Sequence, residues 1–396
     1  MNQTQIQIPI LSFFTGAGFM DIGFLLQGYN VIWHNEYNPS FVKAFESGMK
    51  SLGYRGSSIT VQNTESIVNI GPNQILTEAF GGNKKPEVFG VIGGPPCPDF
   101  SVGGKNRGHM GDNGRLSEVY VRRVLELNPT FFVFENVPGL LRTKKHRDFL
   151  LSLMIKLKDR YALDISILNA LDFGVPQDRE RVFLIGFQRN WLKKHLGNTA
   201  YKQVTDTAEF ISQLNKLKPK DFFAQASHWF PWPENPDYKG AKTRFDWPKA
   251  PVPLGEEPQR PGCPEELMVG TYICDDIRNN LPNAKEAFQP KSDKFKTTLE
   301  GDVSKKSFKK LHRYRYSPAV AYGNNEVHLH PTLPRRLTVR EALMLQSVPN
   351  EYILPENLSL SDKFKTIGNG VPVKLAEAVA GSLQSVIEGK KFREAI

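Results

Sequence analysis

The chain alternates short, continuously apolar segments with segments in which apolar residues recur at helical spacing. Uninterrupted apolar runs are typical of strands in a parallel sheet that is covered on both faces. Strands are expected at residues 8–14, 30–34, 88–92, 130–134, 163–168 and 181–187. Helices are expected between them at residues 19–27, 39–50, 116–127 and 147–159. This order predicts an α/β fold with a doubly wound, mostly parallel sheet, whose ligand chemistry lies at the carboxyl ends of the strands.

The alternation stops at about residue 191 and returns near residue 333. The sequence between is rich in proline, aromatic residues and lysine, as in HWFPWP at 228–233. Beyond it, Thr338 and Glu341 have the spacing of a helix capping box, and a glycine turn at 367–372 precedes a helix expected at 373–387. We therefore predict an α/β domain at 1–190, an insertion at 191–333 and a segment at 334–396 that returns to the first domain.

Composition fits a globular protein with a large core. Hydrophobic residues make up 40% of the 396 positions and charged residues 23%, which suits two domains or one domain with an insertion. No apolar run approaches the roughly 18 residues of a membrane span, and the start lacks the pattern of a signal peptide. Three cysteines with no CxxC pair predict a reducing compartment and no metal site.

The net charge of +10 favours a polyanionic partner, although a basic protein without such a partner would have the same charge. Residues 291–315 hold nine Lys or Arg against three acids. This stretch is either a solvated loop or a surface that contacts nucleic-acid phosphates.

A thiol and a carboxyl follow neighbouring apolar runs. Cys97 comes after the run at 88–92 and two prolines, and Glu135 comes after the run at 131–134. A nucleophile and an acid at adjacent strand ends suit catalysis. A buried cysteine can also be a small hydrophobe, but the flanking prolines and glycines favour a shaped loop.

A glycine turn with Gly16 and Gly18 follows the first strand, and Glu36 ends the second strand about twenty residues later. Such a turn lets a ligand approach a helix N-terminus, and the carboxylate can accept hydrogen bonds from a ribose. Both features suit NAD or S-adenosylmethionine, while Glu36 can also be an ordinary surface carboxylate. Hydride transfer has no use for a Cys–Glu pair, whereas addition of a thiolate to a pyrimidine does.

Six blocks along the chain resemble the DNA (cytosine-5)-methyltransferases of bacterial restriction–modification systems. They are SFFTGAGF, GGPPCPDFS, FENV, QDRERVFLIG at 177–186, RRLTVREALMLQSVP at 335–349 and IGNGVPV at 367–373. The resemblance spans most of the chain except residues 191–332, where the family keeps its variable target-recognition region. No long extension precedes the first block, which fits a full-length enzyme of this kind.

The resemblance implies that Cys97 adds covalently to carbon 6 of cytosine and that Glu135 acts at ring N3. This addition makes carbon 5 nucleophilic enough to take a methyl group from S-adenosylmethionine. The resemblance also implies that Arg179 and Arg181 are catalytic, as the arginines that orient the catalytic loop and hold the base carbonyl oxygen. The alternative for both arginines is a strand-edge ion pair with a neighbouring acid of the QDRER block.

The implied cofactor is S-adenosylmethionine. Its binding residues are expected to be Phe14, Gly16, Gly18, Glu36, Ser66, Leu116 and Asn369. Phe14 and Leu116 would also fit as ordinary core residues. Three positions depart from the family: Glu65-Ser66-Ile67 stands where Asp-Ile is usual, Pro98 where Gln is common, and Gly370 where Ser is frequent.

The implied substrate is double-stranded DNA, in a cleft between the α/β domain and the insertion, with the target base flipped out. The glycine-rich loop at 102–115 would close over the DNA, although it can also be an ordinary surface loop. The expected DNA contacts are Ser101, Lys105, Arg107, Lys305, Lys306, Lys309 and Lys310. A separate restriction endonuclease acting on the same site, a monomeric state and a bacterial cytoplasmic location near the nucleoid are also expected.

Two other functions share these features. An RNA cytosine-5 methyltransferase of the same fold would have every catalytic block, but the long insertion and the lack of a Cys-Phe-Thr signature favour DNA. A catalytically silent DNA-binding relative would keep the fold, but intact Cys97, Glu135 and Arg181 count against it.

Overall fold

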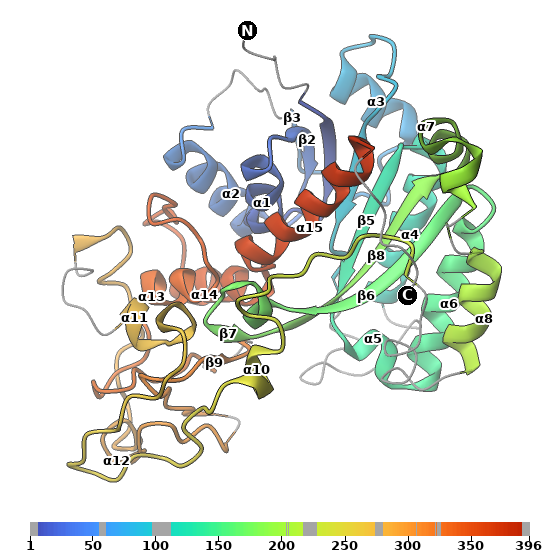
Figure 1. Cartoon of the computed structure of the whole chain (residues 1–396). Helices are drawn as coiled ribbons and strands as arrows, with labels where there is room; N and C mark the ends of the chain where they lie inside the picture. Colours follow the sequence, from blue (N-terminus) through green and yellow to red (C-terminus); the bar gives the residue numbers. More distant parts are fainter. Residues whose placement is uncertain are drawn as a thin grey trace, which may run out of the picture.

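The computed structural model is built around one central sheet, with a second lobe at one end (Figure 1). It describes residues 7–54, 61–96, 112–202, 204, 206–216, 228–273, 280–305, 307–320, 322 and 326–389. Among these residues, no helix is both long and apolar enough to cross a membrane.

The sheet has seven strands in the order β3-β2-β1-β4-β5-β8-β6. The strands are β1 (Pro9–Phe13), β2 (Asn30–Asn35), β3 (Val61–Asn63), β4 (Gly90–Gly93), β5 (Phe131–Asn136), β6 (Tyr161–Asn169) and β8 (Glu180–Gln188). All neighbours from β3 to β5 are parallel, whereas β8 runs antiparallel between β5 and β6. After β3 the chain returns to place β4 on the other side of β1, so the carboxyl ends of β1 and β4 form the switch point where such sheets bind ligands.

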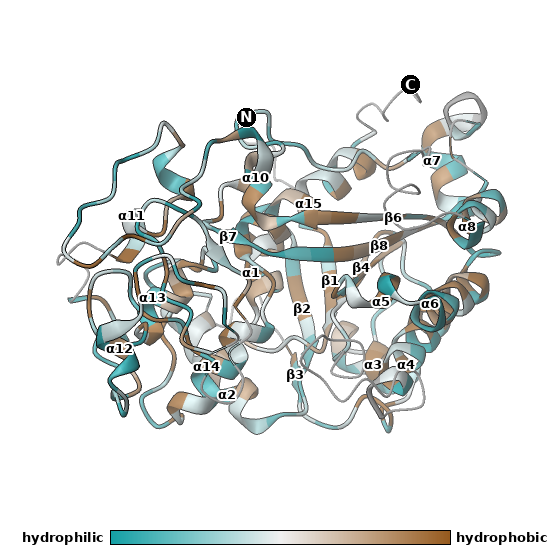
Figure 2. Cartoon of the chain, turned by 90° about the horizontal axis from the view of Figure 1, so that it is seen from below, coloured by the Kyte–Doolittle hydropathy of each residue, from teal (hydrophilic) through white to brown (hydrophobic). Residues whose placement is uncertain are grey.

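Helices cover both faces of the sheet and bury its apolar residues (Figures 1 and 2). One layer consists of α3 (Pro72–Phe80), α4 (Asp112–Leu127), α5 (Gly139–Arg142), α6 (Lys144–Leu157) and α8 (Thr207–Lys216). The other layer contains α1 (Phe19–Leu26), α15 (Val373–Ile387), α7 (Arg189–Tyr201) and the short η2 (Ala170–Phe173). The helix α15 packs along α1, which brings the last helix of the chain beside the first.

The second lobe is rich in loops and has a core of its own. Its short elements are β7 (Gln177–Asp178), α10 (Ala241–Arg244), η3 (Glu265–Leu267), α11 (Gly270–Ile273), α12 (Lys294–Thr297) and β9 (Ser317–Pro318). The helices α2 (Pro39–Ser51), α13 (Val339–Met344) and α14 (Leu360–Asn369) share a buried cluster with residues of this lobe. The lobe is therefore packed against the helices near the first glycine turn.

The α/β prediction and its expected strands are confirmed, with ends shifted by at most two residues. The capping box at Thr338 is present, and α15 has the expected bounds. The loss of periodicity after residue 191 was misleading, because α7 and α8 form there and pack on the sheet. Residues 228–233 do the same, so α7, α8 and this segment, all within the expected insertion, contact the α/β domain.

A buried carboxylate fastens the aromatic segment at 228–233 to the edge strand β6. Asp164 accepts hydrogen bonds from Phe230 N at 2.9 Å and from Trp232 Nε1 at 3.1 Å, and it lies 2.7 Å from His228 Nδ1. Trp229 Nε1 donates to the Leu163 carbonyl at 2.9 Å. The segment thus lies against β6 near Leu163 and Asp164 and occupies one backbone carbonyl of this edge strand, which hinders pairing with another chain there.

Replacing Asp164 with alanine should lower the free energy of unfolding by about 3 kcal/mol, because several buried donors lose their acceptor. Urea denaturation would measure the loss. Asp159→Ala, an exposed change near the same strand, is the control and should stay within about 0.5 kcal/mol of the parent. Equal unfolding midpoints for the two variants would show that Asp164 does not fasten the segment.

Candidate active site

The carboxyl ends of β1, β4 and β5 bring the predicted reactive segments together. The register pairs Phe13 with Gly93 and Gly93 with Phe134, so the residues after each strand meet at one edge. A β-carbon on Gly94 would lie 2.5 Å from Glu135 Oε2, which means that the chain leading to Cys97 passes directly over this carboxyl group. Asn136 Nδ2 donates to the Pro95 carbonyl at 3.4 Å and fixes the same passage.

Glu135 forms a buried ion pair with Arg181. Arg181 Nε lies 2.9 Å from Glu135 Oε1, and each side chain is 10% exposed. Burial raises the pKa of Glu135 above its ordinary value, although the guanidinium groups of Arg181 and Arg179 oppose the shift. The acid form of Glu135 is therefore more accessible than that of an exposed glutamate, which suits a proton donor.

Arg179 is fastened elsewhere. Its guanidinium donates to three backbone carbonyls, those of Val320 at 2.7 Å, Gly368 at 2.6 Å and Gly370 at 2.9 Å. This buried side chain thus links the start of β8 to the insertion and to the last glycine turn. These contacts hold Arg179 in a linking position, and the catalytic role expected from the sequence stays a prediction.

Asp178 does not form the strand-edge ion pair that was the alternative for the two arginines. That carboxylate pairs with Lys242 at 2.8 Å and accepts from Asn169 Nδ2 at 2.7 Å. Arg181 contacts Glu180 through the backbone carbonyl, to which its Nη1 donates at 2.8 Å. Arg181 thus directs its charge toward Glu135.

The first glycine turn and Glu36 meet as expected. Glu36 accepts hydrogen bonds from Gly16 N at 2.9 Å and from Asn38 N at 2.8 Å, one on each carboxylate oxygen. Burial raises the pKa of Glu36, and these backbone donors oppose the shift. Each oxygen keeps a lone pair that a ribose hydroxyl can use.

The turn itself has the backbone that close approach of a ligand requires. Phe14 has a φ of 54°, unusual for a residue other than glycine, and it leads the chain sharply off β1. Gly18 has a φ of 77°, and a side chain there would collide with Phe45 and Met49. At Gly16 a β-carbon would meet nothing within 4 Å. The turn therefore leaves open space next to the half-buried carboxylate of Glu36, so a ligand can approach the backbone there.

The other cofactor candidates are Phe14 of the turn and three residues from other parts of the chain. Phe14 and Leu116 are half-buried and pack on the same core, so the core-residue interpretation holds for part of each side chain. Ser66 is half-buried in the loop after β3, whose start is fixed by Asn35 Nδ2 donating to the Glu65 carbonyl at 2.9 Å. Asn369 is exposed at the end of α14.

Sequence reasoning missed the support beneath the turn. Thr15 Oγ1 donates to Asp21 Oδ2 at 2.7 Å and lies 3.0 Å from Ser12 Oγ, and Asp21 is fully buried. The available signal was a carboxylate within the apolar start of α1. This network anchors the turn from below.

Several predicted residues lie outside the described part of the chain. They are Cys97, Ser101, Lys105, Arg107 and Lys306. Lys305 is exposed and Lys309 is half-buried, as phosphate contacts require. Lys310 is only 7% exposed and burial lowers its pKa, which counts against its prediction as a DNA contact.

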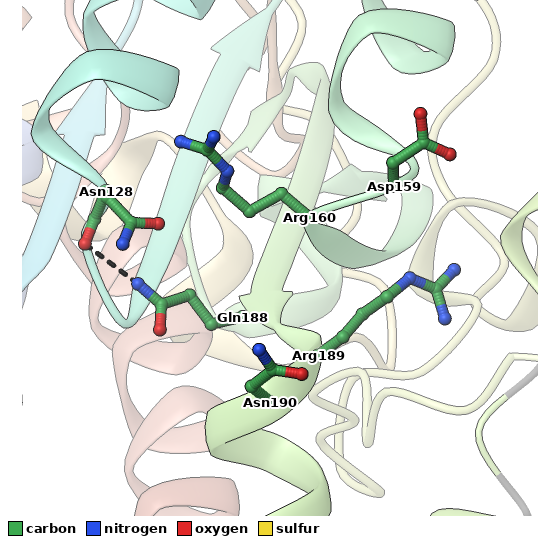
Figure 3. Close-up of a pocket in the computed structure, with 6 residues that line it drawn as sticks. All are labelled: Asn128, Asp159, Arg160, Gln188, Arg189 and Asn190. Atoms are coloured by element: carbon green, nitrogen blue, oxygen red, sulfur yellow. Dashed lines mark hydrogen bonds between the residues drawn. The ribbon is translucent and has the colours of Figure 1, made fainter.

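A hollow of about 460 Å³ lies at the opposite edge of the sheet, where β8 ends (Figure 3). Its arginines are already bound to helix ends, with Arg160 Nη1 on the Leu125 carbonyl and Arg189 Nε on the Lys158 carbonyl. Gln188 Nε2 donates to the Asn128 carbonyl at 2.8 Å. The hollow therefore lies at the other end of β8 from Glu135, which pairs near the start of that strand. Within the described ranges, no three His, Cys, Asp or Glu side chains are grouped to hold a metal ion.

Known proteins are similar to this chain over almost its whole length. The Type II methyltransferase M.NmeDI of Neisseria meningitidis serogroup C is 40% identical over 98% of this chain and 86% of its own length. M.MthTI of Methanothermobacter thermautotrophicus is 28% identical over 97% of this chain and 99% of its own.

Solved structures share the fold. A candidate DNA modification methyltransferase from an E. coli prophage matches with a TM-score of 0.63 at 20% identity, covering 96% of this chain and all of its own. DNMT2 of Spodoptera frugiperda matches with a TM-score of 0.56 at 15% identity, with the same coverage. The sequence model of the C-5 cytosine-specific DNA methylases matches residues 8–385, and the chain belongs to this family.

Proposed function

We propose that this methylase modifies carbon 5 of a flipped cytosine in a specific duplex DNA site through a covalent adduct with Cys97. The observation that carries the proposal is the buried Glu135–Arg181 pair, which lies directly beneath the residues that lead to Cys97. The relatives named as Type II methyltransferases support a role in a restriction–modification system. A separate endonuclease for the same site and a monomeric enzyme belong to this proposal.

The chemistry assigns a task to each residue. The Cys97 thiolate adds to carbon 6, and the electron pair of the 5,6 double bond shifts toward carbon 5 while Glu135 donates to ring N3. Arg181 holds Glu135 in place and can donate to the base carbonyl oxygen. S-adenosylmethionine, when bound, supplies an electrophilic methyl group. After carbon 5 has taken the methyl group, a base removes its proton, the double bond re-forms and the thiolate leaves.

The cofactor residues are proposed from the geometry of the glycine turn. Glu36 would accept the ribose hydroxyls, Gly16 would leave room for the ligand, Gly18 would give the turn its left-handed backbone against Phe45 and Met49, and Phe14 would lie against the adenine. Ser66, Leu116 and Asn369 would complete the pocket.

The substrate must leave the helix stack before it can react. Duplex DNA would lie between the sheet domain and the second lobe, with the segment 102–115 closing over it. Arg179 enters this proposal as a positioning residue, because its carbonyl partners belong to the insertion and to the turn that carries Asn369.

Cys97→Ser should abolish methyl transfer while DNA and cofactor binding persist, because an alcohol is a far poorer nucleophile than a thiolate at neutral pH. Transfer of tritiated methyl groups to DNA measures the loss, with tRNA as the parallel substrate that tests the RNA alternative. A 5-fluorocytosine duplex should trap the parent enzyme covalently. Turnover by the variant, or no adduct on the peptide that contains residue 97, would overturn the mechanism.

Glu135→Gln should reduce the rate of methyl transfer by about two orders of magnitude or more, because the amide cannot donate a proton to N3. Affinity for S-adenosylmethionine should hardly change. In the parent, the rate at saturation should fall as pH rises through the raised pKa of Glu135, since the acid form is lost there. A loss of cofactor binding in the variant would place Glu135 in the cofactor pocket.

Replacing Lys305, Lys306 and Lys309 with glutamine should weaken binding to specific and non-specific duplexes alike and reduce the salt dependence by up to about three units of slope. Site preference should persist, because phosphate contacts do not read sequence. The control replaces Lys144, Lys156 and Lys193, which are exposed on α6 and α7. The measurement is a set of binding isotherms at several salt concentrations, from which the slope of log affinity against log salt is obtained. Equal slopes for both triple variants would show that this segment does not contact DNA.

A further inference from the structure

The hydroxyl of Tyr352 reaches from the C-terminal segment into the first glycine turn. It donates to the Ala17 carbonyl at 2.8 Å and lies 3.0 Å from the Ala44 carbonyl on α2. Tyr352 is fully buried, so water cannot replace it at either carbonyl. Burial also raises the pKa of Tyr352, which keeps the hydroxyl protonated as a donor.

Side chains from three parts of the chain support the turn. The Thr15 side chain is held by Asp21 of α1, and Gly16 N is held by Glu36 at the end of β2. The Ala17 carbonyl is held by Tyr352, 335 positions later in the sequence. Of these supports, Tyr352 fixes the residue that directly precedes Gly18 and the start of α1.

The ring of Tyr352 has little freedom to move. It packs edge-on against Phe19, with 5.5 Å between ring centroids and an interplanar angle of 79°. A β-carbon on Gly48 would lie 2.0 Å from the ring, so α2 passes directly against it. The hydroxyl is thus delivered to Ala17 by a rigid side chain.

The other end of Tyr352 is fastened to the insertion. Its carbonyl accepts from Arg340 Nη2 at 2.5 Å, and Arg340 Nε donates to the Pro282 carbonyl at 2.8 Å. Two residues later, Leu354 N donates to Asn283 Oδ1 at 3.0 Å. The segment that carries Tyr352 therefore has a fixed position relative to residues 282–283.

We infer that Tyr352 is a positioning residue for cofactor binding. By holding the Ala17 carbonyl, its hydroxyl keeps the backbone from Gly16 to Gly18 in the shape that admits S-adenosylmethionine. This inference rests on the proposed function, because it concerns the affinity of that turn for the proposed cofactor.

The test compares Tyr352→Phe with Tyr29→Phe in the full chain. Tyr29 is also buried, and its hydroxyl donates to the Ala380 carbonyl at 3.1 Å, away from the glycine turn. Both variants keep the aromatic ring and lose one hydroxyl bonded to a carbonyl, so their Tm values should fall by similar amounts. The readouts are Kd for S-adenosylmethionine by calorimetry, KM for the cofactor, kcat and Kd for duplex DNA.

Tyr352→Phe should raise Kd and KM for S-adenosylmethionine about five- to tenfold, the effect of one hydrogen bond of ordinary strength. Its kcat at saturating cofactor and its Kd for DNA should stay near those of the parent, and Tyr29→Phe should leave all four values unchanged. Equal cofactor affinity in both variants would overturn the inference. A parent protein that does not bind S-adenosylmethionine would contradict the proposed function instead.

Discussion

The antiparallel direction of β8 is the constraint on which the site depends. Because β8 enters the sheet at the edge where β5 ends, its first residues lie beside Glu135. A parallel strand in the same position would place its carboxyl end there and carry Arg181 to the opposite edge, far from the acid. The reversal also places Arg179 next to the insertion, where three backbone carbonyls from distant segments accept its hydrogen bonds. One strand direction therefore assembles the acid site and anchors the second lobe.

The electrostatics of this edge combine two opposing effects. Burial favours the neutral form of Glu135, whereas Arg181 at 2.9 Å favours the carboxylate. Neither charge could be buried alone without a large cost, so removing Arg181 would leave an unpaired buried acid. The carboxyl group of Glu135 is therefore held rigidly, and its raised pKa keeps the protonated form accessible. This balance suits a group that donates to a substrate ring during one step of a reaction and recovers its proton afterwards.

Local rules explain what the sequence could predict. Continuous apolar runs identified the strands, and Thr338 and Glu341 marked a helix start, since each feature depends on a few neighbouring residues. Adjacency of Glu135 and the residues before Cys97 followed from the rule that parallel strands end at one edge. The direction of β8 was not predictable, because an apolar run has the same appearance in a parallel and in an antiparallel strand. The burial of Lys310 was hidden too, because it depends on residues distant in sequence.

The parts that sequence could not predict share a physical cause: they satisfy polar backbone groups between segments that are far apart in the chain. Arg340 donates to carbonyls of the insertion and of the loop that holds Tyr352, and it has no carboxylate partner in these contacts. Gln177 similarly donates to the Leu345 carbonyl and accepts from Val320 N. Loops without regular pairing need such side chains, because their buried carbonyls would otherwise lack donors. Long polar side chains therefore reinforce the apolar cluster that the second lobe shares with α2, α13 and α14, and the position of the lobe is tied to the turn that we expect to bind the cofactor.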